Sequence, residues 1–260
     1  MLDKLISIVR AAGELIPRDL HTGLSVVEKT GPRDLVTKYD ALVQERLQTD
    51  LLRLLPQAGF MGEEGFHAGD WQRYEWLFIV DPIDGTTNFI QGIPNSSVSV
   101  GLMHNGQIEY GVVFNPFTGE LFSARRGGGS FRNGRRLRVE DRPLSHSLLL
   151  FGSAVYYPEL IETTLRLFGL CFPLAQDVRR FGSAALDLCD FAAGRAGAFF
   201  ECRLCPWDYA AGSLIAEEAG VKVTKLDGSP LGFFAKGSVL AGTPTCWEEL
   251  RRLFSEVETP

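Results

Sequence analysis

The stretch WLFIVDPIDGTT, residues 76–87, contains the transition that decides how this chain folds. Its first five residues form a compact apolar run, which predicts a buried strand. The run ends abruptly at two carboxylates, Asp81 and Asp84, on either side of a Pro-Ile pair. Proline restricts its own φ angle and stiffens the turn. Carboxylates at the end of a buried strand lie where α/β sheets bind their ligands, so the sequence predicts a ligand site here.

The residues that follow Asp84 predict a second part of that site. Gly85 permits a backbone angle that other residues resist, and Thr86 and Thr87 look like a helix start that their hydroxyls can cap. A helix start presents free N–H groups and the positive end of the helix dipole, which suits a phosphate. Residues 81–87 therefore offer oxygen ligands for a hard cation such as Mg²⁺ beside a cradle for an anion.

The composition indicates an ordinary globular protein. The chain has 260 residues, 45% of them hydrophobic and 22% charged, enough for one large domain or two small ones sharing a core. Its formal net charge is −6, whereas nucleic-acid binders usually show a basic balance or stripe. We therefore expect no nucleic-acid partner. A negative protein that binds a negative phosphate needs local positive charge, and metal ions are one source of it.

The sequence gives no sign of membrane association. No run approaches the roughly 20 apolar residues that a spanning helix needs, and the N-terminus reads as an amphipathic helix, not a signal peptide. We therefore expect a cytoplasmic location. The five cysteines are an odd number, which argues for reduced thiols.

The pattern of apolar residues predicts both helices and strands. Helical spacing is found over 2–16 and 37–55, and alternating runs flank Asn105-Gly106, which is typical of a β-hairpin. A second Asn-Gly pair, at 133–134, suggests another hairpin. One helix is expected over 177–193.

The pattern of predicted elements changes near residue 145, after which strands and helices alternate. Such alternation indicates α/β layering. We expect two subdomains packed as one compact unit. Residues 1–145 would carry most of the metal ligands, and residues 146–260 would supply Asp208 and substrate contacts.

Further carboxylates are candidates for the same site, because two are too few for a centre of two metal ions. Glu63-Glu64 precede the buried strand, and Asp208 follows Trp207 at a predicted helix start. Taken singly, each of these is more typical of a turn, an N-cap or a solvated surface. When these carboxylates occur together and in this order, a shared metal site becomes the better interpretation.

The motifs, taken in order, resemble those of the inositol monophosphatase family. DPIDGTTNF at 81–89 is similar to the family's first signature, and WDYAAG at 207–212 to its second. Gly62-Glu63-Glu64 matches the glutamate motif, and DLVT at 34–37 with Asp40 matches an early element. The resemblance spans nearly the whole chain. It implies an α+β fold, a layered α/β/α/β/α sandwich shared with fructose-1,6-bisphosphatases, and a homodimer.

The resemblance also implies a role for each matched position. It implies two Mg²⁺ ions and a third, weaker one. The implied metal ligands are Glu63, Asp81, the backbone carbonyl of Ile83, Asp84 and Asp208. The implied catalytic residues are Asp40 and Thr86, which orient and deprotonate a water, and Glu63, which helps to position the third ion. The implied substrate contacts are Asp84, Gly85, Thr86, Gly182, Ser183, Ala184, Glu201 and Asp208.

The implied activity is that of a Mg²⁺-dependent phosphoric monoester hydrolase. It would cleave the phosphate monoester of a small polyol, first of all inositol monophosphate, with metal-activated water. Similar metal sites in relatives act on fructose 1,6-bisphosphate, histidinol phosphate or nucleotide 3′-phosphates, and these alternatives stay open. The Asp-x-x-Asp spacing, with proline between, fits chelation better than the Asp-x-Asp turn of phosphatases that form an aspartyl phosphate.

A different class also stays open, a non-catalytic protein that interacts with RNA or a transcription complex. The arginines between Arg125 and Arg138 would then form its basic patch. The net charge of −6 favours two solvated hairpin turns instead. A salt-dependent binding assay separates the two interpretations, because phosphate contacts weaken steeply with salt.

Overall fold

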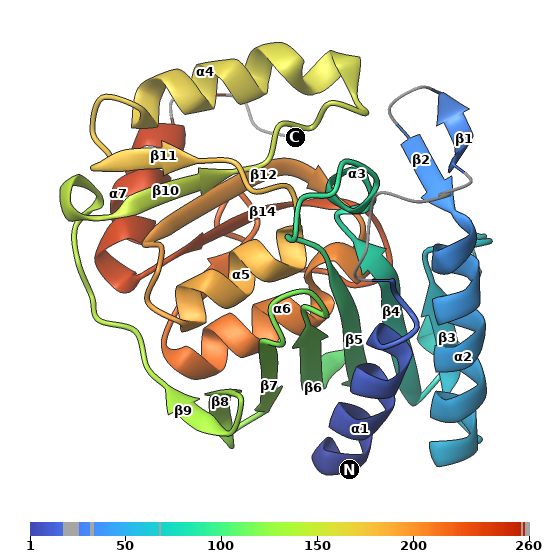
Figure 1. Ribbon diagram of the computed structural model, residues 1–260. Coiled ribbons are helices and arrows are strands. Elements are labelled where there is room, and N and C mark those ends of the chain that lie inside the picture. Colours follow the sequence, from blue (N-terminus) through green and yellow to red (C-terminus); the bar gives the residue numbers. More distant parts are fainter. Residues whose placement is uncertain (18–25, 32–33, 68, 256, 258–260) are drawn as a thin grey trace.

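The computed structural model describes residues 1–17, 26–31, 34–67, 69–255 and 257. Two large β-sheets and the helices that cover them make up most of this part of the chain (Figure 1). A small two-stranded sheet pairs β1 (Val26–Gly31) with β2 (Asp34–Thr37). Among the described residues, no helix combines the length and apolar character that crossing a membrane requires.

The larger sheet has seven strands in the order β3-β4-β5-β6-β7-β8-β9. β3 runs parallel to β4, and each later pair is antiparallel. The strands are β3 (Gly59–Gly62), β4 (Trp76–Asp84), β5 (Ser97–His104), β6 (Gln107–Phe114), β7 (Leu121–Arg125), β8 (Gly129–Arg132) and β9 (Arg135–Leu137). The predicted strand at 76–80 is therefore confirmed as part of β4.

Both Asn-Gly pairs form the hairpins that the sequence predicts. Asn105 has a φ of 48° and Gly106 a φ of 83°, and Asn133 and Gly134 have 48° and 78°. Two consecutive positive φ angles are what a two-residue type I′ turn requires. The first pair joins β5 to β6, and the second joins β8 to β9.

The smaller sheet has five strands in the order β11-β10-β12-β14-β13. The pairs on either side of β10 are parallel, and those of β14 are antiparallel. The strands are β10 (Leu148–Phe151), β11 (Asp177–Arg179), β12 (Ala198–Leu204), β13 (Lys222–Thr224) and β14 (Gly237–Gly242).

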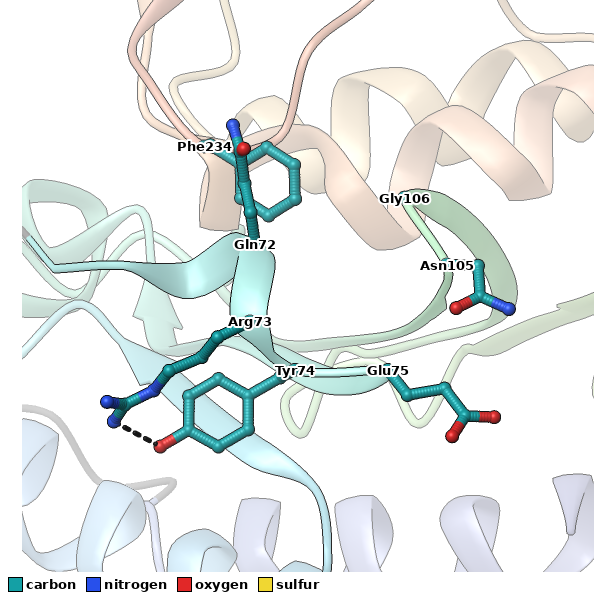
Figure 2. Close-up of a pocket in the computed structure, with 7 residues that line it drawn as sticks. All are labelled: Gln72, Arg73, Tyr74, Glu75, Asn105, Gly106 and Phe234. Carbon is teal, nitrogen blue, oxygen red and sulfur yellow. Dashed lines mark hydrogen bonds between the residues drawn. The ribbon is translucent and has the colours of Figure 1, made fainter.

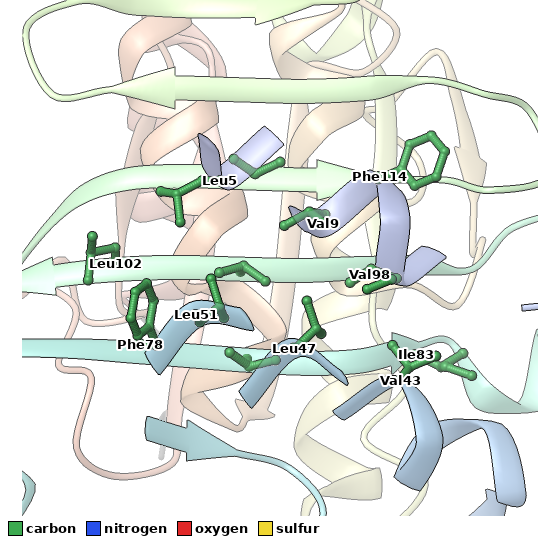
Figure 3. Close-up of a cluster of buried hydrophobic side chains, with 14 of the residues drawn as sticks. Leu5, Val9, Val43, Leu47, Leu51, Phe78, Ile83, Val98, Leu102 and Phe114 are labelled. Carbon is green, nitrogen blue, oxygen red and sulfur yellow. The ribbon is translucent and has the colours of Figure 1, made fainter. Parts of the chain in front are cut away.

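Helices α1 (Leu2–Gly13) and α2 (Lys38–Leu54) cover the outer face of the seven-stranded sheet. Their apolar side chains recur at helical spacing and point at the strands, as Figure 3 shows for Leu5 of α1 and Leu47 of α2. Leu47, Leu51 and Phe78 of β4 are all fully buried. Burial of such a side chain stabilises the fold by about 1.5–3 kcal/mol.

The remaining helices complete the layers. α5 (Ala184–Ala192) and α6 (Pro206–Ala219) lie between the two sheets and pack on both. α4 (Ile161–Cys171) and α7 (Pro244–Phe254) cover the outer face of the five-stranded sheet, and α3 (Thr86–Ile90) is a short helix after β4. Short 3-10 turns occupy Trp71–Arg73, Leu144–His146 and Pro158–Leu160. The predicted α/β/α/β/α order is therefore confirmed.

The expected single helix over 177–193 is wrong. Residues 177–179 form β11, which pairs with β10, and α5 begins only at Ala184. Gly182 has a φ of 84°, which no helix residue adopts, and the Ser183 hydroxyl accepts a hydrogen bond from the Leu186 N–H as an N-cap. The helical spacing read across this break belongs to α5 alone.

Glycines in the seven-stranded sheet let α6 lie close to it. A Cβ added to Gly111 of β6 would lie 2.6 Å from the carbonyl oxygen of Ala211, and one on Gly101 of β5 would lie 3.1 Å from the Ala210 Cβ. Asp208 lies in the first turn of α6. This close packing therefore fixes where Asp208 lies relative to the strands.

Candidate metal centre and active site

Four of the predicted site residues lie at neighbouring strand ends of the larger sheet. Asp81, Ile83 and Asp84 are the last residues of β4, and Glu63 directly follows β3. The parallel pairing places Gly62 opposite Val80, and the Glu63 N–H donates to the Val80 carbonyl at 3.1 Å. Burial raises the pKa of Asp81, and Glu63 lies close enough to that carboxyl to raise its pKa further.

Asp208 comes to the same place from α6. Pro206 begins that helix, and the Cys205 N–H donates to Asp208 Oδ2 at 2.7 Å, so the carboxylate caps its own helix start. Asp81, Asp84 and Asp208 each offer one oxygen, and these atoms lie within 4.8 Å of one another. Residues more than 120 positions apart in the sequence thus form one acidic cluster, which can hold a metal ion.

Burial and mutual repulsion raise the pKa values in this cluster. Burial is the main cause for Asp81 and Asp208, and repulsion by Glu63 at the first and by Asp84 at the second raises each pKa further. Burial also raises the pKa of Asp84, to about 6, although hydrogen bonds from Ser183 and Ala185 oppose the increase. Hard oxygen donors that repel one another are the ligand set that a divalent cation such as Mg²⁺ stabilises, so the residues fit that ion.

The predicted phosphate cradle follows the cluster directly. Gly85 has a φ of 87° and precedes α3, and a Cβ there would lie 3.0 Å from the Asn95 carbonyl oxygen. Both conformation and space therefore require glycine. Its carbonyl accepts hydrogen bonds from the Ser96 hydroxyl at 2.9 Å and the Phe89 N–H at 3.1 Å, which hold the turn in place.

Asp40 lies behind Thr86. The Thr86 hydroxyl is 3.3 Å from Asp40 Oδ1 and 3.0 Å from the Ile83 carbonyl oxygen. The other Asp40 oxygen accepts from the Thr37 N–H at 2.8 Å and from its hydroxyl at 2.6 Å, in a capping box at the start of α2. Thr86 is among the described residues that line the cavity and Asp40 is not. Asp40 therefore reaches the cavity through Thr86.

Ser183 and its neighbours join the second half of the chain to the metal cluster. The Ser183 hydroxyl donates to Asp84 Oδ2 at 2.5 Å, and the Ala185 N–H donates to the same oxygen at 2.8 Å. Negative charge at the first turn of α5 is favoured by the helix dipole. Gly182, Ser183 and Ala184 all line the cavity. The Ser183 side chain is engaged with Asp84.

Glu201 lies in β12 and is partly buried against the loop after β10. A Cβ on Gly152 would lie 1.9 Å from the Glu201 carboxylate, so only glycine leaves room for it. The Ala154 N–H donates to Glu201 Oε1 at 3.4 Å. Burial raises the pKa of Glu201 to about 7. The carboxyl group lines the cavity, where it can bind a substrate hydroxyl in either protonation state.

The site residues thus surround a cavity of about 490 Å³ between the two halves of the chain. Its volume is within the range of small-molecule sites. The cavity wall also includes Phe66, Arg180, Asp187 and Lys236, which sequence reasoning did not assign. Asp187 is buried with its Oδ1 unpartnered among the described residues. No local motif marks these four, because the fold alone brings them to the cavity.

Nearly the whole chain is similar to known proteins. A family model described as the inositol monophosphatase family matches residues 1–259. The chain belongs to the inositol monophosphatase family. Among its relatives, the Nus factor SuhB of Pseudomonas aeruginosa is 38% identical over 256 residues, covering 96% of this chain and 94% of the relative. The inositol-1-monophosphatase of Rhizobium meliloti is 38% identical over 264 residues, covering 97% and 95%.

Solved structures of family members share the fold. The extragenic suppressor protein suhB of Bartonella henselae has a TM-score of 0.89 at 36% identity, with 98% of both chains covered. The inositol monophosphatase of Anabaena sp. has a TM-score of 0.87 at 35% identity, with 99% of this chain and 96% of the other covered.

A second hollow, about 550 Å³, lies outside this family site. Figure 2 shows Arg73, Tyr74 and Glu75 on one side of it, with Asn105 and Phe234 around them. The Arg73 guanidinium donates to the Tyr74 hydroxyl at 2.8 Å. None of the metal-cluster carboxylates lines it. The chemistry of the inositol monophosphatase family is therefore to be sought in the smaller, acidic cavity.

Cys189 and Arg195 have the Cys-x₅-Arg spacing of cysteine phosphatases, but not their environment. Cys189 is fully buried in α5, where burial raises the pKa of its thiol far above the usual value. The Arg195 guanidinium pairs with Asp190 at 2.8 Å and with Glu120. A nucleophilic cysteine needs an exposed thiolate, so this pair is structural.

Proposed function

We propose that the protein is a Mg²⁺-dependent phosphatase that hydrolyses the phosphate monoester of a small polyol, first of all inositol monophosphate. The observation that carries this proposal is the juxtaposition, in one cavity, of the acidic cluster and the glycine turn at the start of α3. The acidic cluster suits Mg²⁺ ions, and the glycine turn suits the phosphate anion. A relative named inositol-1-monophosphatase supports the choice of substrate.

The proposed Mg²⁺ ligands are Glu63, Asp81, the Ile83 carbonyl, Asp84 and Asp208, for two ions and a third, weaker one. When bound, the ions supply Lewis-acid charge that polarises the phosphoryl oxygens and lowers the pKa of a water. The protein holds its ligands rigidly, because Asp84 is fixed by α5 and Asp208 by the Cys205 N–H. Such preorganisation reduces the reorganisation that the reaction requires.

Thr86 and Asp40 are proposed to orient and deprotonate the attacking water. The Thr86 hydroxyl lines the cavity, and Asp40 lies 3.3 Å behind it. A water that donates to Thr86 can pass a proton along this pair to the Asp40 carboxylate. The backbone N–H groups at Gly85 and Thr86 are proposed to bind the phosphate.

The leaving group is proposed to lie against the second half of the chain. Glu201 and Asp208 can accept hydrogen bonds from its hydroxyls, and the backbone of residues 182–184 lines the same wall. The Ser183 hydroxyl instead positions Asp84, which refines the role implied by resemblance. Burial of these polar groups makes an unfilled hydrogen bond costly and so favours a polyol.

The experiment is phosphate release from a substrate panel, with Mg²⁺ and with EDTA. The panel holds inositol 1-phosphate, fructose 1,6-bisphosphate, histidinol phosphate, adenosine 3′,5′-bisphosphate and NADP. We expect Mg²⁺-dependent release, with inositol 1-phosphate the best substrate. Silence across the panel from folded, Mg²⁺-loaded protein would contradict the proposal, and preference for another member would select that alternative.

The variant Asp81→Asn tests the assignment of the metal centre. We expect kcat/KM to fall by about 10³-fold or more, because losing a buried metal ligand removes several kcal/mol of charge stabilisation. Asp3→Asn, an exposed carboxylate on α1, is the matched control and should keep wild-type activity. Near-normal turnover by folded Asp81→Asn with bound Mg²⁺ would refute the assignment.

We also propose that the protein is cytoplasmic and acts as a homodimer. Phe181 and Ile93 are large apolar side chains that are 38% and 47% exposed. Their loops are joined, because Asn88 and Asn95 both donate to the Phe181 carbonyl, at 2.6 and 3.2 Å. We propose that a second copy of the chain covers these two side chains, because patches of exposed apolar groups are typical of protein–protein contact surfaces.

A second candidate function is interaction with RNA or a transcription complex. Arg135, Arg136 and Arg138 are exposed on and beside the edge strand β9. Several relatives bear the name Nus factor SuhB. RNA binding that falls steeply with salt, and is lost in an Arg135→Gln/Arg136→Gln/Arg138→Gln variant, would support this candidate. No binding at low salt would reject it for RNA.

A further inference from the structure

A cationic wall, defined by Tyr157, Arg203 and Lys236, lines the active-site cavity away from any motif. The Lys236 Nζ lies 2.9 Å from the Tyr157 hydroxyl, to which it donates. It is 5.1 Å from the centroid of the Tyr157 ring, and the Arg203 Cζ is 4.8 Å from the same centroid. One aromatic ring thus positions two cations at the edge of the cavity.

The two cations differ in how their charge is compensated. Arg203 pairs with Glu159 at 2.6 Å, outside the set of residues that line the cavity. In the part of the chain that the structure describes, no carboxylate ion pair within 4.0 Å involves Lys236, whose partner is the neutral Tyr157 hydroxyl. That hydrogen bond raises the pKa of the Lys236 ammonium, so it stays charged. Lys236 is therefore a cation that Tyr157 holds in place and that no carboxylate of the described residues neutralises through an ion pair.

The cationic wall is close to the metal cluster. The Cys205 N–H donates to Asp208 Oδ2 at 2.7 Å, so Cys205 directly adjoins one of the proposed metal ligands. Cys205, Asp208 and Lys236 all line the cavity. A ligand whose phosphate lies at the metal cluster can therefore extend its leaving group toward Lys236.

We propose that Lys236 forms a binding subsite for a second anionic group on the leaving group of the substrate. The inference rests on the proposed phosphatase function and narrows its substrate class. The preferred substrate would be a phosphorylated polyol that carries a further phosphate or carboxylate beside the phosphate that is cleaved. A compact ammonium with three donors suits such a group, and Tyr157 holds it in place.

The test compares inositol 1,4-bisphosphate with inositol 1-phosphate, and wild type with Lys236→Gln. We expect Lys236→Gln to lower kcat/KM for the bisphosphate by about 10- to 100-fold, mainly through KM, the range of one charge-assisted hydrogen bond. The value for the monophosphate should stay within about twofold, because this substrate has no second anionic group that Lys236 could bind. Lys4→Gln on α1 makes the same charge change outside the cavity and should alter neither value. Tyr157→Phe should give a smaller loss, specific to the bisphosphate.

The outcomes separate this inference from the proposed function. Equal effects of Lys236→Gln on both substrates, or no effect on either, would overturn the subsite while leaving the phosphatase intact. An arm with gluconate 6-phosphate would show whether a carboxylate serves as well as a phosphate. If no substrate turns over, calorimetric binding of the bisphosphate with Mg²⁺ present decides, and equal affinity of wild type and Lys236→Gln would overturn the subsite.

Discussion

At the scale of single residues, the site is a set of carboxylates held together against their own repulsion. Asp81, Asp84 and Asp208 approach within 4.8 Å of one another, although the first two are buried and the third is partly buried. Neutral hydrogen-bond donors from Ser183, Ala185 and Cys205 hold two of them. A bound cation would compensate the repulsion among these carboxylates.

The first prediction concerns the pH dependence of Mg²⁺ binding. Burial raises the pKa of Asp84 to about 6, and the pKa values of Asp81 and Asp208 are also raised, so protons compete with Mg²⁺ for these carboxyls. Mg²⁺ binds only the ionised ligands. Its Kd should therefore rise below about pH 6, by about tenfold per pH unit for each proton taken up. Calorimetry between pH 5 and 8 measures this dependence.

The stability of the metal-free protein should change in the opposite direction. Raised folded-state pKa values favour the folded state at acid pH, and this stability is lost as the pH rises through them. Mg²⁺ should therefore raise Tm more at pH 8 than at pH 5. Asp84→Asn should weaken both dependences. A Kd for Mg²⁺ that is constant from pH 5 to 8 would contradict the raised pKa values.

Local sequence predicts only those site residues that stand directly beside a recognisable strand or turn. Asp81 and Asp84 stand directly after an apolar strand, so their placement could be inferred from the sequence itself. Glu201 was inferred only by resemblance, and Gly152, which makes room for it, is 49 positions earlier. Lys236 was not predicted at all. Contacts of that range depend on how the sheets pack, which no local pattern encodes.

At the scale of elements, helix ends carry much of the site. The first turn of α5 binds Asp84, the first turn of α6 contains Asp208, and α2 begins with the capping box that holds Asp40. The two central helices must therefore be placed accurately on the sheet. The close approach of α6 at Gly111 provides this placement.

The variant Gly111→Ala should disturb that placement. Its Cβ would lie 2.6 Å from the Ala211 carbonyl oxygen and 3.2 Å from its Cα, both backbone atoms, so α6 has to move. We expect a loss of about 1–3 kcal/mol in the free energy of unfolding, as for other overpacked cores. We also expect weaker Mg²⁺ binding, because Asp208 moves with α6. Denaturant unfolding and calorimetry measure the two effects.

Gly169→Ala is the matched control. Gly169 is exposed in α4, with no atom within 4 Å of the added Cβ. There alanine should stabilise the protein by up to about 1 kcal/mol, because glycine is a poor helix former. Equal stability of Gly111→Ala and wild type would show that α6 is not held by this contact.

Elements with strong local signals were predicted correctly, and one without them was not. The Asn-Gly hairpins depend on two residues that tolerate positive φ, a requirement that sequence reveals directly. In the 177–193 segment the helical spacing hid a strand, because Gly182 and the Ser183 cap were read as part of one helix. Pairing of β11 with β10 depends on a distant segment.

At the scale of the whole molecule, the site belongs to neither half of the chain. The strands of the seven-stranded sheet lie between residues 59 and 137, and those of the five-stranded sheet between 148 and 242. Asp81 and Asp84 come from β4 of the first sheet, Glu201 comes from β12 of the second, and Asp208 comes from α6 between them. A division at residue 145 into two subdomains stays a proposal, and a site formed by both explains why they would not act separately.

The last prediction is the homodimer. Phe181 directly precedes the Gly182–Ala184 wall of the cavity and is exposed together with Ile93 of a hydrogen-bonded loop. A charge placed in an apolar contact surface is left desolvated and unpaired when two copies associate. Phe181→Glu should therefore shift the protein from dimer to monomer in sedimentation experiments at micromolar concentration. Leu42→Glu on α2, at a leucine that is 46% exposed, is the control and should leave the dimer intact. A monomeric wild type would refute the dimer, and a dimeric Phe181→Glu would place its interface elsewhere.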